Sequence, residues 1–206
     1  MYIFAYLIQF KPNYYKTMKK LIYLFLFAFV TSIAFVGCDD EDDSSSPFKT
    51  VMLGAQDNET IDGFYSINLD KTYTLDEAAS DKANIDLLCY YDAAKNLMTL
   101  ASPGANLDGV FTGTNDPEAW NVADTTFFHQ VDASLLTVAQ FDLLIADSEL
   151  IEPLFDTENA KRKAKELSVN DIYAFQTEDS KIGLFKVVSV TAGNDGFVEF
   201  TYILKE

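Results

Sequence analysis

Residues 171–205 carry the pattern that most restricts what this chain can fold into. They form three extended segments separated by turn-forming residues: "DIYAFQT", "KIGLFKVVSV" and "GFVEFTYILK". In the last segment Val198, Phe200 and Tyr202 alternate with other side chains, and alternation places them on one face of a strand. Asn194-Asp195-Gly196 precedes this segment and is typical of a β-hairpin, because glycine accepts a positive φ. We therefore expect a three-stranded antiparallel meander at the C-terminal end.

Further strands are expected upstream of this meander. The segments "VMLGAQ", "FYSINL", "NLMTLAS" and "TTFFHQV" read as extended, and "NIDLLCYYD" is almost continuously apolar. A strand without alternation is typical of one that is buried on both faces. The pattern leaves open whether these strands form their own sheet or join the C-terminal one.

Two capping signals mark short helices. Thr74 is followed three residues later by Glu77, which is a capping box and predicts a helix over 75–83. Thr137 and Gln140 repeat this spacing. The helix that follows them is expected to bury one apolar face, made of Val138, Phe141, Leu144 and Ile145.

A third helix is predicted from Thr157, in "TENAKRKAKEL", because acids come early and basic residues late, as the helix dipole favours. Its basic residues are interpreted as a solvated face; they are Lys161, Arg162, Lys163 and Lys165. Together these elements predict one α+β domain over residues 48–206, with a mixed or antiparallel sheet, the C-terminal meander and a few short helices.

The N-terminal segment has the organisation of a secretory leader. Lys19 and Lys20 precede an apolar stretch from Leu21 to Val36, which is about 24 Å long as a helix and shorter than a bilayer core of about 30 Å. Met18 is the more ordinary start of such a signal. We therefore interpret residues 1–17 as an over-extended start and residues 18–37 as the signal peptide.

The sequence "FVGC" at the end of this leader resembles the lipobox of bacterial lipoproteins, although Phe35 stands where leucine is usual. The resemblance implies cleavage after Gly37 and a diacylglycerol anchor on Cys38. Each CH₂ of an acyl chain that is buried in a bilayer contributes about 0.8 kcal/mol of binding free energy, and two or more chains hold a protein on the membrane.

Five acids follow the lipid-bearing cysteine: Asp39, Asp40, Glu41, Asp42 and Asp43. With "SSSP" they complete an extended tether over residues 38–47, since a charged run without apolar residues cannot build a core. The run is similar to the acidic export signal of surface lipoproteins in Bacteroidota-type bacteria. Short pieces of residues 50–204, such as "IYAFQTEDSKIGLFKV", resemble uncharacterised lipoproteins of the same bacteria. The resemblance implies an outer-membrane protein that faces the cell exterior, and it brings no catalytic residue.

Charge excludes one class of partner. The chain has 15 basic and 32 acidic residues, a formal charge of −17. Four lysines and no acid lie in residues 1–37, so the mature chain would keep 11 basic residues and a charge of −21. Such a field repels phosphate backbones and anionic membrane surfaces, so we expect no nucleic acid partner.

A few single side chains carry groups that could react, stack or bind a metal. His129 is interpreted as a partly buried structural residue beside Phe127 and Val131, and Cys89 as a core residue. Trp120, in a loop rich in Gly and Asn, is the best candidate for stacking on a sugar, with a loop-anchoring role as the alternative. The acidic loops "DNETIDG" and "TNDPE" could offer oxygen ligands to calcium, but neither has EF-hand spacing. We expect no cofactor, metal site or catalytic residue.

The expected function is therefore a non-enzymatic binding or accessory protein of the cell envelope, held on the membrane by Cys38. Its partner would be another envelope protein or an extracellular glycan. A first alternative is a small surface hydrolase that cleaves glycans with two carboxylates. A second is a structural component that assembles by strand addition at the edge of the C-terminal sheet.

Overall fold

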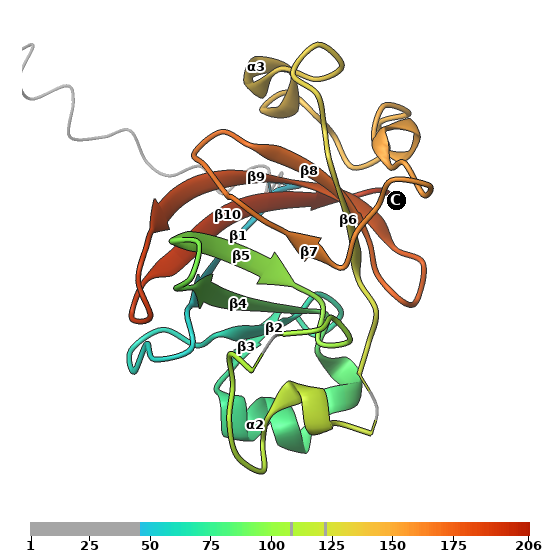
Figure 1. The fold of residues 1–206 in the computed structure, drawn as a ribbon. Helices are drawn as coiled ribbons and strands as arrows, with labels where there is room; N and C mark the ends of the chain where they lie inside the picture. The colour runs from blue at the N-terminus through green and yellow to red at the C-terminus, as the bar shows by residue number, and fades with distance from the viewer. Residues whose placement is uncertain (1–45, 108, 122) are drawn as a thin grey trace, which may run out of the picture. The chain divides into compact units, whose positions relative to one another are not determined.

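The computed structural model describes residues 46–206, apart from residues 108 and 122 (Figure 1). These residues make up one compact unit, Ser46–Glu206. The predicted leader, Cys38 and the acids from Asp39 to Asp43 lie outside the described residues. Within the described part of the chain, no helix is long and apolar enough to cross a membrane.

Two five-stranded sheets form the described unit, and every strand pair in them is antiparallel. Sheet A has the order β1 (Lys49–Gly54), β10 (Phe197–Leu204), β9 (Ile182–Thr191), β8 (Ile172–Gln176) and β6 (Phe127–Gln130). Sheet B has the order β3 (Lys71–Tyr73), β2 (Phe64–Ser66), β4 (Leu87–Asp92), β5 (Leu97–Ala101) and β7 (Lys163–Ala164). The sequence left open whether the N-terminal strands join the C-terminal sheet or form their own. Strand β1 joins the C-terminal sheet, whereas β2 to β5 belong to a separate sheet.

The helices are too short for the α+β class that the sequence suggested, and the fold is mostly β. They are α2 (Leu75–Ser80), α3 (Val138–Phe141) and the 3₁₀ turns η1 (Lys82–Asn84), η2 (Pro117–Ala119) and η3 (Glu152–Leu154). The expectation of a single sheet-rich domain with an antiparallel sheet and a few short helices is confirmed.

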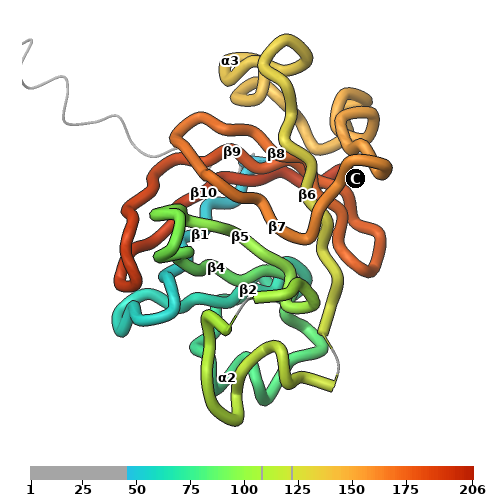
Figure 2. Tube along the Cα trace, viewed as in Figure 1, coloured from blue at the N-terminus to red at the C-terminus, as the bar shows by residue number. Residues whose placement is uncertain are grey.

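The main hydrophobic core lies between the two sheets, which face each other in Figure 1. Sheet A contributes Phe185 and Phe200, and sheet B contributes Leu87 and Leu100, all of them buried. A second cluster covers the outer face of sheet B beneath α2 and the loops after β5. A third covers part of the outer face of sheet A, where the chain between β6 and β7 makes the excursion that carries α3 (Figure 2).

Strand β4 confirms the prediction of a strand that is buried on both faces. Leu87 and Cys89 belong to the core between the sheets, whereas Leu88 and Tyr90 belong to the outer cluster under α2. The apolar run has no alternation because both of its faces are covered.

The C-terminal meander is present as β8, β9 and β10. The hairpin between β9 and β10 also forms, but the glycine with a positive φ is Gly193, at +138°, rather than Gly196. Gly196 is needed for a different reason, because a Cβ there would lie 2.1 Å from the backbone oxygen of Thr191. The turn therefore depends on glycine at two positions.

Both capping boxes are confirmed, at Thr74 with Glu77 and at Thr137 with Gln140. The second helix stops after four residues, so its predicted apolar face is only partly correct. Phe141 and Leu144 are buried, but Ile145 is 60% exposed.

The helix predicted from Thr157 is wrong. Residues 157–159 form a turn, Lys161 makes a β-bridge with Phe128, and β7 follows at Lys163–Ala164. Backbone hydrogen bonds to two sheets override the helical propensity of this segment. The basic residues are consequently not the solvated face of a helix.

Candidate anion-binding site

Residues 161–164 connect the edges of the two sheets. The backbone of Lys161 exchanges two hydrogen bonds with Phe128 at the edge of sheet A, with N···O distances of 2.7 and 2.8 Å. One residue later the carbonyl of Arg162 accepts from the Ser102 N–H at 3.0 Å, and Ala164 then pairs with Leu100 of sheet B. We call residues 161–165 the basic bridge. Because successive side chains of an extended segment lie on opposite faces, Lys161, Lys163 and Lys165 share one face and Arg162 lies on the other.

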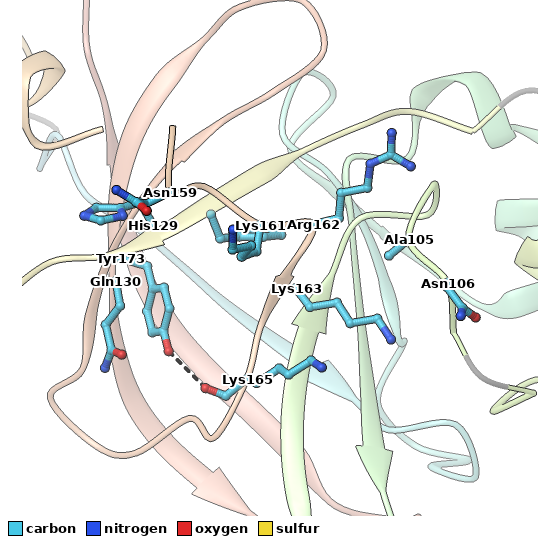
Figure 3. Close-up of a pocket in the computed structure, with 11 residues that line it drawn as sticks. Ala105, Asn106, His129, Gln130, Asn159, Lys161, Arg162, Lys163, Lys165 and Tyr173 are labelled. Carbon is cyan, nitrogen blue, oxygen red and sulfur yellow. Dashed lines mark hydrogen bonds between the residues drawn. The ribbon is translucent and has the colours of Figure 1, made fainter. Parts of the chain in front are cut away.

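The basic bridge forms one wall of a pocket of about 740 Å³ (Figure 3). Strands β6 and β8 and the loop after β5 supply the other walls. The lining residues are Ala105, Asn106, Phe128, His129, Gln130, Asn159, Lys161, Arg162, Lys163, Lys165 and Tyr173.

Several neighbours fix the position of these basic side chains. Arg162 Nη1 donates to the Gly104 carbonyl at 2.7 Å, and its guanidinium carbon lies 5.8 Å from the centre of the Phe127 ring. Lys163 Nζ lies 5.3 Å from the centre of the Tyr90 ring. In Figure 3 Lys163 and Lys165 extend toward the same side, and Arg162 points away from them.

The backbone of Lys165 is held by Tyr173, whose hydroxyl donates to the Lys165 carbonyl at 3.0 Å. Burial, helped by the negative charges of Asp171 and Glu166, raises the pKa of Tyr173, so the phenol stays a neutral donor. Strand β8 thereby fixes the distal end of the basic bridge.

The pocket is electrostatically unlike the rest of the chain. Among the residues that the structure describes, its lining includes four cations and no aspartate or glutamate, in a protein with a formal charge of −17. Within the described part of the chain, Lys161 and Lys165 form no ion pair within 4.0 Å, and both are exposed. Unpaired ammonium groups beside one hollow make a site for an anion, because a charged acceptor there gains charge-assisted hydrogen bonds.

His129 lies on β6, where it pairs with Ala174 of β8, and it is half-buried as the sequence suggested. It also lines the pocket. The opposite case is Cys89, which is fully buried; burial raises the pKa of its thiol, so the core role expected for it is confirmed.

Trp120 is anchored in its loop. Its Nε1 donates to the Asn115 carbonyl at 3.0 Å, and its ring centre lies 6.0 Å from that of Phe64 in the cluster under α2. The side chain nevertheless remains half-exposed and lines a second hollow of about 450 Å³. These contacts agree with the loop-anchoring role of Trp120. Because the side chain also lies beside a hollow, its role in stacking on a sugar stays a prediction.

Among the residues that the structure describes, two acids have a raised pKa, Asp86 and Asp124. Asp86 is 2% exposed and accepts the Ile67 N–H at 2.7 Å; burial raises its pKa to about 6. Burial and the charges of Glu178, Asp86 and Asp179 raise the pKa of Asp124 to about 6 as well. Neither residue lines any of the four hollows described for this structure.

The acidic loops weighed for calcium are closed by their own hydrogen bonds. In the loop over residues 57–63, Asn58 Oδ1 accepts from the backbone of Thr60 and Ile61. Among the residues that the structure describes, no group of three or more His, Cys, Asp or Glu side chains could hold a metal ion.

Fold and site together define a two-sheet antiparallel β domain with a basic pocket at one junction of the sheets. A similar fold occurs in the crystal structure of a DUF4466 family protein from Parabacteroides merdae ATCC 43184, with a TM-score of 0.51 and 15% sequence identity. The match covers 77% of this chain and 54% of that protein, so the chain spans about half the length of its structural neighbour. The neighbour comes from the Bacteroidota, the group to which the sequence resemblance points. No family model matches the chain, and no curated protein matches it in sequence.

The sequence contained a signal for the pocket that a helical interpretation hides. In "KRKAK", lysines occupy every second position, and period two is the spacing of one face of a strand. A partner for this strand was not visible, since β5 and β6 are separated from it by more than 30 positions.

Proposed function

We propose that this chain is a lipid-anchored, surface-exposed protein whose domain binds an anionic ligand in the basic pocket without chemical conversion. The observation that carries the proposal is the concentration of charge: four of the 11 basic residues after position 37 lie in the five-residue bridge and line one pocket. Diffusely placed cations would be neutralised by the surrounding acids, whereas a cluster keeps a local positive potential.

The ligand-binding part is tested by NMR titration of residues 46–206, a unit that contains both sheets and all three hydrophobic clusters. D-Glucuronic acid is the probe, and D-glucose is its uncharged match. We expect glucuronate to shift the amide signals of β6, β7 and β8, and glucose to leave them unchanged.

The matched variants carry the same change of charge at two places. Lys161→Gln with Lys165→Gln should raise the Kd for glucuronate at least tenfold. Lys71→Gln with Lys82→Gln, which removes two lysines that do not line the pocket, should change it less than twofold. If the two double variants changed the Kd equally, glucuronate would respond to the overall charge of the protein and not to the pocket, which would contradict the proposal.

The cellular address rests on the lipobox at Cys38 and the acids after it, and the origin of the structural neighbour supports it. Protease treatment of intact cells tests it, with a periplasmic protein as the control. Loss of the domain while the control survives is the expected result. Protection of the domain until the outer membrane is opened would place it in the periplasm, and the acidic run would then serve as a tether only.

The sheet edges bear on the alternative of strand addition. Both flanks of the C-terminal meander are occupied, by β1 on one side and β6 on the other. An added strand would therefore have to pair with β1 or β6 themselves, and the proposal of a ligand-binding protein does not require one.

A further inference from the structure

The basic pocket adjoins the second hollow, the one lined by Trp120. The two hollows share Ala105, Asn106 and Arg162 as lining residues. We propose that together they bind an acidic oligosaccharide in which charged and uncharged units alternate, with the acidic unit in the basic pocket and the uncharged unit beside Trp120. This inference rests on the proposed function and specifies the class of its ligand.

Arg162 stands at the boundary between the two hollows. Its hydrogen bond to the Gly104 carbonyl and the Phe127 ring beneath it fix the guanidinium. That bond uses one of the five N–H donors of the guanidinium, so a ligand that passes over the loop could accept from the others. A ligand confined to the basic pocket would use only the lysine side of the bridge, whereas a longer chain reaches Arg162 and the hollow beyond it.

The chemistry of the second hollow differs from that of the first. It is lined by Trp120, two prolines and Glu118. The Glu118 carboxylate is held in place, since Oε1 accepts the Leu107 N–H at 2.7 Å and the Glu118 N–H donates to Asp116 at 2.9 Å. A fixed carboxylate repels a second acidic unit, and an indole edge with proline rings favours the apolar face of an uncharged sugar.

Amide side chains favour a saccharide over an acidic peptide. Gln130 and Asn159 line the basic pocket, and amides can donate to and accept from the hydroxyl groups that surround a sugar acid. No sheet edge runs free along the pocket for a peptide backbone to pair with, because residues 161–164 already bond to both sheets in this part of the described structure. A tetraglutamate peptide is therefore the counter-probe.

The experiment compares two tetrasaccharides by calorimetry on residues 46–206. One alternates glucuronic acid with N-acetylglucosamine, and the other is tetragalacturonate, in which each unit carries a carboxylate. We expect the alternating probe to bind at least tenfold more tightly than tetragalacturonate or tetraglutamate. Glu118→Gln keeps an acceptor for the Leu107 N–H but removes the negative charge that repels a second acidic unit. It should therefore reduce the ratio of the Kd for tetragalacturonate to that for the alternating probe at least threefold.

Trp120→Ala supplies the second readout. It should weaken binding of the alternating tetrasaccharide at least tenfold and leave the Kd for monomeric glucuronate within twofold. Because Trp120 also packs on Phe64, thermal unfolding is measured in parallel, and Glu118→Gln keeps the test decisive if the tryptophan variant does not fold.

The outcomes separate this inference from the proposed function. If glucuronate binds through Lys161 and Lys165 but the wild type treats the two tetrasaccharides alike, the second hollow is not a subsite and this inference fails alone. Tighter binding of tetraglutamate would overturn it in favour of an acidic peptide. If none of these anions binds the wild type, the proposed function fails with it.

Discussion

Two of the places where the two sheets are joined differ in the kind of contact that joins them. Near β1 and β2, the Tyr65 hydroxyl donates to Asp70 and lies 2.9 Å from that of Tyr202, while Lys49 Nζ is 2.8 Å from Asp70. We call this the tyrosine junction. At the other side, the basic bridge joins β6 to β5 through its backbone, and Lys161 has no acidic partner among the described residues.

Under the proposed function, the first of these places would serve stability and the second would serve binding. In the tyrosine junction both rings are buried, and burial raises the pKa of Tyr65 and Tyr202, so both hydroxyls stay neutral. Its only charges, on Lys49 and Asp70, pair with each other. In the basic bridge the main chain makes the connection, and Lys161 and Lys165 form no ion pair with any residue that the structure describes. Changes at the first place should therefore cost stability, and changes at the second should cost binding.

The largest effect is expected from Tyr65→Ala. This substitution removes a ring that is 2% exposed and leaves the buried Tyr202 hydroxyl without its tyrosine partner. Loss of a large core ring costs about 3–5 kcal/mol in the free energy of unfolding. Urea denaturation measures it, and Lys161→Ala, on the exposed bridge, should stay within about 0.5 kcal/mol of wild type. Similar losses at both positions would mean that the two junctions are equally structural.

A smaller effect, dependent on pH, is expected from Asp86→Asn beside the tyrosine junction, where the Asp86 N–H donates to the Tyr65 carbonyl. Burial raises the pKa of Asp86 to about 6, from 3.8. Between these values the folded state binds more protons than the unfolded state, so this carboxyl lowers wild-type stability as pH rises toward 6.

The asparagine variant lacks that titration. Its free energy of unfolding, relative to that of wild type, should increase by about 2 kcal/mol between pH 4 and pH 8, as the raised pKa of Asp86 implies. Urea denaturation at both pH values checks this, with Asp57→Asn at an exposed carboxylate as the matched control. A difference that stays constant with pH would show that Asp86 is ionised in the folded protein at no cost.

The basic bridge should respond to salt where the tyrosine junction does not. Raising NaCl from 0.05 to 0.5 M shortens the screening length to a few ångströms, so the Kd for glucuronate should rise about fivefold. The free energy of unfolding provides the internal comparison, since buried aromatic contacts are not screened. A Kd insensitive to salt would indicate that the amides, and not Lys161 and Lys165, carry the recognition.

The sequence predicted the parts of this fold whose contacts are local. The β9–β10 hairpin and the capping box at Thr74 depend on residues within a few positions of each other, and both formed as expected. The segment from Lys161 failed because its partners, Phe128 and Leu100, lie in strands that are distant along the chain. A composition suited to a helix could not reveal that two sheet edges compete for the same backbone groups.

The site followed the same rule. The sequence offered Trp120 as a sugar-stacking candidate and His129 as a structural residue, and the structure places both beside hollows. That those hollows adjoin at Arg162 depends on the pairing of β7 with β5, which no local pattern encodes. The charges and their period-two spacing were visible in the sequence, but the two sheet edges that hold this segment extended were not.

The smallest effect is expected from Lys49→Gln, which separates charge from packing inside the tyrosine junction. The side chains of Lys49 and Asp70 are 47% and 51% exposed, and an ion pair this open contributes about 0.5 kcal/mol or less. Asp70 still accepts from Tyr65 after the change, so the buried hydroxyls keep their partners. Urea denaturation should thus show almost no loss, and the Kd for glucuronate should not move, although Lys161→Gln makes the same change of charge. A loss of several kcal/mol in the free energy of unfolding would instead show that the exposed ion pair holds the tyrosine junction together. Charge would then matter at both junctions, and it would no longer distinguish the structural one from the binding one.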